Sequence, residues 1–71
     1  MSLTEHHVTT NELRALDARP LHDRADAVSD EGTPRLFALL AGAAELGLEP
    51  LCQTIRRELA SRGEDADRLA L

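Results

Sequence analysis

The chain has 71 residues and a formal net charge of −5, from eight arginines and no lysine against thirteen acidic side chains. A chain of this length holds at most one domain and has little apolar surface to bury, because burial falls as chains shorten. Its acidity disfavours nucleic acid as the default partner. The single cysteine, Cys52, excludes an internal disulfide, and the single aromatic residue, Phe37, excludes a stacking platform for bases.

No stretch approaches the ~20 apolar residues that a membrane span needs. The first ten residues, MSLTEHHVTT, lack the basic start and apolar centre of a signal peptide. We therefore expect a cytoplasmic location and no membrane partner.

The first predicted helix covers residues 10–18, after a flexible lead at residues 1–8. Thr9 can act as its N-cap, and Glu12, three residues later, can complete a capping box. The second predicted helix covers residues 20–31 and starts at Pro20, because proline suits the first helical position. Its inward face is expected to carry three apolar side chains at spacings of four and three residues: Leu21, Ala25 and Val28.

The third predicted helix, residues 34–46, is the centre of the fold. Thr33 is its expected cap, Pro34 its first residue and Gly47 its left-handed stop. Its large apolar side chains cover roughly half of its circumference, which is wider than the stripe of an ordinary surface helix. Small residues occupy most of its other side.

The fourth predicted helix covers residues 50–62 and stops at Gly63. The tail at residues 64–71 is either a docked last turn or disordered, and the sequence leaves both alternatives open. Four helices joined by short loops predict an all-α fold, a small bundle of about four short helices in one domain spanning residues 9–63.

The broad apolar surface of the third helix suggests that other protein surfaces contribute to its burial. The small side is covered either by the other helices or by another chain, since a helix that is apolar all round must be buried. We predict a non-enzymatic protein-interaction module, an adaptor, regulatory or chaperone-like subunit that works as a homodimer or within a complex. The expected partner-binding residues are Phe37, Ala38, Leu40, Ala41, Gly42 and Glu45.

The alternative function is DNA binding. The segment AAELGLEPLCQTIRREL resembles the helix-turn-helix of many repressors, in which the second helix enters the major groove. Gly47 would form the turn, but about two more residues separate it from Thr54 than in the familiar motif. The residues that would contact DNA are Thr54, Arg56, Arg57 and Arg62.

Other candidate chemistry is sparse. Cys52 is expected to be a small buried apolar residue, and His6 and His7 with Glu5 do not have the spacing of a metal site. The acidic side chains of the second helix are expected to form a solvated face. These are Asp23, Asp26, Asp30 and Glu31. We expect no catalytic residue, no bound metal and no cofactor.

Overall fold

The computed structural model describes residues 8–64. It contains four helices: α1 (Thr10–Ala18), α2 (Leu21–Ser29), α3 (Thr33–Leu46) and α4 (Glu49–Ser61). No strand occurs between residues 8 and 64, so the predicted all-α class is confirmed. Apart from Val8 and Glu64, the predicted lead and tail lie outside the described residues.

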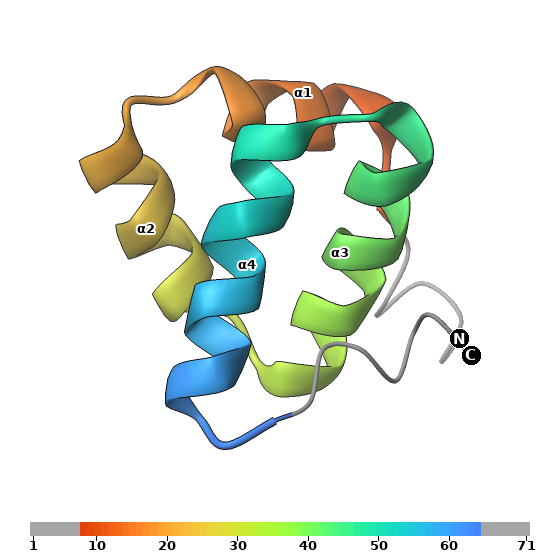
Figure 1. Ribbon diagram of the computed structural model, residues 1–71. Coiled ribbons are helices and arrows are strands. Elements are labelled where there is room, and N and C mark those ends of the chain that lie inside the picture. Colours follow the sequence, from red (N-terminus) through yellow and green to blue (C-terminus); the bar gives the residue numbers. More distant parts are fainter. Residues whose placement is uncertain (1–7, 65–71) are drawn as a thin grey trace.

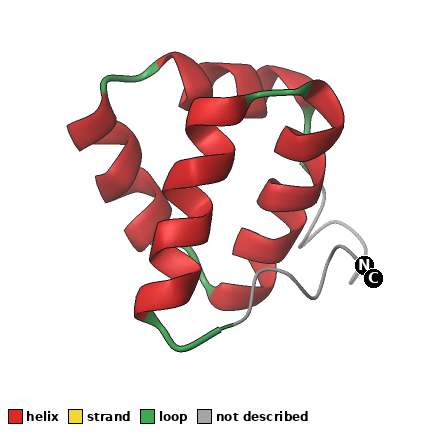
Figure 2. Cartoon of the chain, in the orientation of Figure 1, coloured by secondary structure: helices red, strands yellow, loops and turns green. Residues whose placement is uncertain are grey.

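Helix α4 stands between α2 and α3 and contacts both of them, while α1 crosses one end of the three (Figure 1). The loops between the helices are short and lie at the ends of the bundle (Figure 2). Short connections place consecutive helices next to one another or at one shared end, which is how so small a chain forms one core.

The start of α1 confirms Thr9 as its N-cap, because the Thr9 hydroxyl accepts a hydrogen bond of 3.1 Å from the Glu12 backbone N–H. The reciprocal half of the capping box is absent, since the Glu12 carboxylate pairs with Arg35 of α3. Thr33 is not the cap of α3: Gly32 occupies that position, and Thr33 is the first helical residue. Its hydroxyl accepts a hydrogen bond from Arg62 instead.

The end of α3 follows the prediction. Gly47 has φ +73°, and the Leu48 N–H donates a 2.9 Å hydrogen bond to the Ala43 carbonyl. This pattern is a Schellman motif, which glycine favours because it has no Cβ to oppose a positive φ. The resulting sharp turn brings α4 back alongside α3.

The inward face of α2 differs from the prediction. Val28 is fully buried, but Leu21 is 56% exposed and Ala25 is also exposed. Arg24 takes the inward position instead, four residues before Val28 and on the same side of the helix. The helix is thus rotated relative to the prediction, and the Arg24 guanidinium finds hydrogen-bond acceptors inside the fold where Leu21 was expected.

The core gathers apolar side chains from all four helices. Helix α3 contributes Leu36, Leu39, Leu40 and Ala43, whereas Leu46, on the same apolar arc, is 37% exposed. The remaining buried apolar residues are Leu13, Val28, Leu51, Cys52, Ile55 and Leu59. Four more pack against this cluster while partly exposed: Val8, Leu16, Phe37 and Leu48.

Candidate functional site

Four of the six predicted partner-binding residues reach the surface of α3, and together they form the α3 outer face: Phe37, Ala38, Ala41 and Glu45. Ala41 and Glu45 are exposed, whereas Phe37 and Ala38 are half-buried. Glu45 is the only charged residue of the four. The α3 outer face is therefore a largely uncharged surface of small side chains with one aromatic edge.

The other two predicted residues, Leu40 and Gly42, do not belong to this face. Leu40 is 2% exposed and lies in the core. Gly42 lies against α1: a Cβ added to it would stand 2.7 Å from Leu13 Cδ1. On this side of α3 the small residue accommodates another helix of the same chain, so Gly42 is a packing position and not part of an open surface.

The four residues of the DNA-binding alternative differ in their exposure to solvent. Thr54 is 6% exposed, and its hydroxyl both accepts from Arg24 Nε and donates to the Pro50 carbonyl, each at 2.9 Å. Arg56 and Arg57 are exposed on α4. A buried threonine with its hydroxyl engaged twice cannot reach a base edge in this fold.

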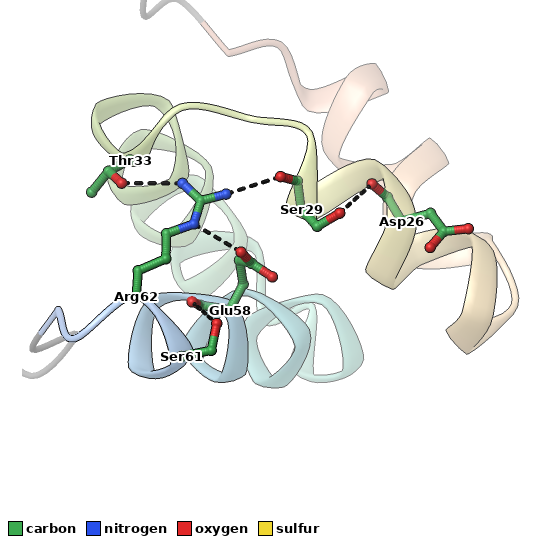
Figure 3. A network of polar contacts seen from close by, with 6 residues as sticks. All are labelled: Asp26, Ser29, Thr33, Glu58, Ser61 and Arg62. Carbon is green, nitrogen blue, oxygen red and sulfur yellow. Dashed lines mark hydrogen bonds and ion pairs between the residues drawn. The ribbon is translucent and has the colours of Figure 1, made fainter.

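Arg62, the fourth residue, ties three helices together (Figure 3). Its Nε donates to the Glu58 carboxylate at 2.8 Å, within α4. Its terminal nitrogens donate to the Thr33 hydroxyl and to the Ser29 carbonyl, both at 3.1 Å. The guanidinium thereby joins the ends of α2 and α4 to the start of α3. Ser29 is the last residue of α2, so Arg62 replaces the backbone N–H that a further turn of helix would have offered to its carbonyl.

We expect Arg62→Ala to lower the free energy of unfolding by about 1.5 kcal/mol, because it removes charge-assisted hydrogen bonds to two other helices from a largely buried side chain. Urea denaturation followed by circular dichroism measures the change. Arg14→Ala is the matched control, since it removes the same charge at an exposed position of α1. An equal effect of the two substitutions would contradict the role assigned to Arg62.

A buried polar network near the start of α4 was missed by the sequence analysis. Arg24 is 9% exposed and donates to Thr54, to the Asp17 carbonyl at 3.2 Å and to the Arg19 carbonyl at 2.7 Å. The Asp17 carboxylate accepts from the Leu51 N–H at 3.1 Å. The network links α1, α2 and α4, and its only sequence signal is that Arg24 shares a helical face with Val28.

A groove of about 500 Å³ runs between α2 and α4, and we call it the α2–α4 groove. It is lined by Leu21, His22 and Ala25 of α2 and by Thr54, Arg57, Glu58 and Ser61 of α4. Leu21 lines it with a side chain that is more than half exposed. Because α2 packs through Arg24 and Val28, Leu21 in its first turn stays at the surface beside the groove.

Cys52 is buried, as expected, and its thiol is suppressed as a nucleophile. Burial raises its pKa above the ordinary value of 9.0, Glu49 and Asp17 raise it further, and Arg56 opposes them. Since the thiolate is the reactive form, Cys52 should react with a disulfide reagent about tenfold or more slowly in the folded protein than in urea.

The same thiol predicts how stability depends on pH. Its pKa is higher in the folded than in the unfolded chain, so above the ordinary value the unfolded chain loses the proton first. Stability should therefore fall as the pH rises above about 9, where lysine and tyrosine usually titrate in other proteins but where this chain has neither. Urea denaturation at a series of pH values measures this dependence. In Cys52→Ala the free energy of unfolding should change little with pH in this range, and a pH dependence equal to that of the wild type would contradict the assignment.

Within residues 8–64, no three His, Cys, Asp or Glu side chains lie close enough together to hold a metal ion. His6, His7 and Glu5 lie outside the described residues. Of the predicted acidic face, Asp23 and Asp26 are exposed on α2 and Asp30 is exposed at its C-cap. Glu31 is instead half-buried and pairs with Arg35 at 3.4 Å. No helix in the described part of the chain is both long enough and apolar enough to cross a membrane.

Comparisons of the chain with models of protein families, with curated proteins and with solved structures gave no match.

Proposed function

We propose that this protein is a small protein-interaction module, an adaptor or regulatory subunit, and that it binds its partner through the α3 outer face. The observation that supports this function is the character of that face. Ala41 is exposed beside half-buried Phe37 and Ala38, and Glu45 is the only charge among the four residues. The central helix of the core is thus also a surface that a second protein can bury.

Small side chains favour a helix as the partner. Alanine lets two helix axes approach to about 8 Å, at the close end of the usual range. Alanine also loses no side-chain rotamer freedom on burial, so this face binds at a low entropic cost. Phe37 supplies the larger contact at the edge, and Glu45 supplies one charge that can fix the orientation of the partner.

The test is site-specific photo-crosslinking in the native cell, with a benzoylphenylalanine side chain in place of Ala41. The matched control is the same side chain in place of Ala15, an exposed alanine of α1. We expect a discrete adduct from position 41 and none from position 15. An adduct from position 41 would support the function whether it forms with a second copy or with another protein. Equal adducts from positions 41 and 15, or no adduct from position 41, would contradict it.

A second step makes the result quantitative. The crosslinked protein is purified, and its affinity for the wild-type chain is compared with that for Ala41→Glu and Ala15→Glu. We expect the first substitution to weaken binding about tenfold or more, because it buries a carboxylate against an apolar surface, and the second to leave it unchanged. Equal affinities would show that the adduct came from proximity and not from a specific interface.

The DNA-binding alternative has less support. Thr54 is buried, and Arg62 holds three helices together, so two of its four residues are used inside the fold. A gel shift at low salt that showed binding weakened by Arg56→Ala and Arg57→Ala would favour it.

A further inference from the structure

The α2–α4 groove combines two features that the proposed function does not use. Its apolar side is formed by Leu21, which is 56% exposed, and by Ala25 one turn later. Leu21 has the highest exposure of any large apolar side chain among the described residues. The exposed leucine is an apolar group that can insert into another surface, and the groove of about 500 Å³ beside it can accept an apolar side chain.

The two sides of the groove carry opposite charges. On the α2 side, the exposed Asp26 carboxylate lies 3.6 Å from the exposed imidazole of His22, which lines the groove. On the α4 side, Arg57 lines the groove and is exposed. Glu58 also lines the groove, but it is neutralised by Arg62 at 2.8 Å.

We propose that the α2–α4 groove is a self-association surface whose occupant is a second copy of this chain. A two-fold axis along the groove places α4 of each copy over α2 of the other. Arg57 of each copy then faces the acidic side of its partner, near Asp26, and the two Leu21 side chains enter the hollows. Such an interface is isologous, so each favourable contact occurs twice.

Charge complementarity selects a second copy over other occupants. At a net charge of −5, two copies repel each other at long range, and an acidic partner is repelled as well. Screening limits this repulsion to about 8 Å at physiological salt, so opposed local charges decide the docking. In the two-fold arrangement a second copy brings Arg57 to α2 and Asp26 to α4 at the same time, so it matches both sides of the groove.

The inference goes beyond the proposed function and does not depend on it. A dimer formed through α2 and α4 leaves both copies of the α3 outer face exposed, which would make the protein bivalent toward its partner.

The test is sedimentation equilibrium of the full chain and its variants, with circular dichroism to confirm that each variant is folded. We expect a reversible dimer with a Kd in the micromolar range, and both Leu21→Ser and Arg57→Asp should raise this Kd about tenfold or more. Arg14→Asp is the matched control: it changes the net charge equally on the exposed side of α1 and should alter Kd less than about twofold.

Three outcomes decide the inference. The double variant Asp26→Arg with Arg57→Asp should restore the dimer to within about threefold of the wild-type Kd, because both charges are exchanged. Failure of that rescue, or a wild-type chain that stays monomeric, overturns the proposal. A dimer that Ala41→Glu disrupts and Arg57→Asp does not would assign self-association to the α3 outer face, which also overturns the inference but supports the proposed function.

Discussion

Replacing Arg24 by alanine is expected to lower the free energy of unfolding by about 3 kcal/mol. The guanidinium is buried and donates to Thr54 of α4, to the Asp17 carbonyl and to the Arg19 carbonyl. Its removal leaves these acceptors without their partner and opens a void beneath α2. A domain of this size has a total stability of about 0.05–0.15 kcal/mol per residue, so the loss is a large share of the whole.

Urea denaturation of Arg24→Ala measures this effect, and Arg14→Ala controls for the loss of one positive charge at an exposed site. Arg24→Lys separates charge from geometry. A lysine has one nitrogen where arginine has a fork of donors, so it should recover less than half of the loss. A lysine variant as stable as the wild type would show that the charge alone matters, and a loss under ~0.5 kcal/mol in Arg24→Ala would contradict the role of the network.

The second large effect is expected at the contact of α1 with α3. Leu13 is the one buried residue of α1, and Leu13→Ala should cost about 3 kcal/mol through lost burial and the cavity left behind. The opposing position, Gly42, is tight, since an added Cβ would stand 2.7 Å from Leu13 Cδ1. The two positions should therefore be strongly coupled.

A double-mutant cycle tests this coupling. In the wild type, Gly42→Ala should be neutral or destabilising, because the clash with Leu13 cancels the gain in helix propensity. In the Leu13→Ala background, the clash is gone, and the same substitution should stabilise the protein by about 1 kcal/mol. The sign of the Gly42→Ala effect is the readout, and stabilisation of equal size in both backgrounds would show that Leu13 does not constrain Gly42.

The sequence predicts well where the signal is local. The stop at Gly47 and the capping hydroxyl of Thr9 occur where they were expected. Both depend on atoms within about five residues of one another, so the pattern of residue types is sufficient to place them. Periodicity likewise predicts the inward side of α3 at Leu36, Leu39 and Ala43, but Leu46 on the same arc is exposed at the end of the helix.

The candidate sites were only partly predictable. Ala41 and Glu45 lie on the surface as expected, but Gly42 is covered by α1, and the sequence left open which chain would cover that side of α3. The groove beside Leu21 was not predicted at all. The groove depends on which face of α2 turns inward. The sequence permits an inward face that contains Leu21 and Val28 as well as one that contains Arg24 and Val28.

The sequence by itself determined the all-α class, the number of helices and their approximate bounds, because caps, stops and apolar periodicity are properties of short segments. Only the tertiary structure decided which surfaces remain available. Arg24 turns inward because hydrogen-bond acceptors from α1 and α4 meet at its position. The Thr54 hydroxyl is 30 residues from Arg24 in the sequence, and the Asp17 carbonyl is seven residues from it. A contact of that separation leaves no periodic trace in the sequence, so the burial of an arginine and the exposure of Leu21 emerge only when the helices pack together.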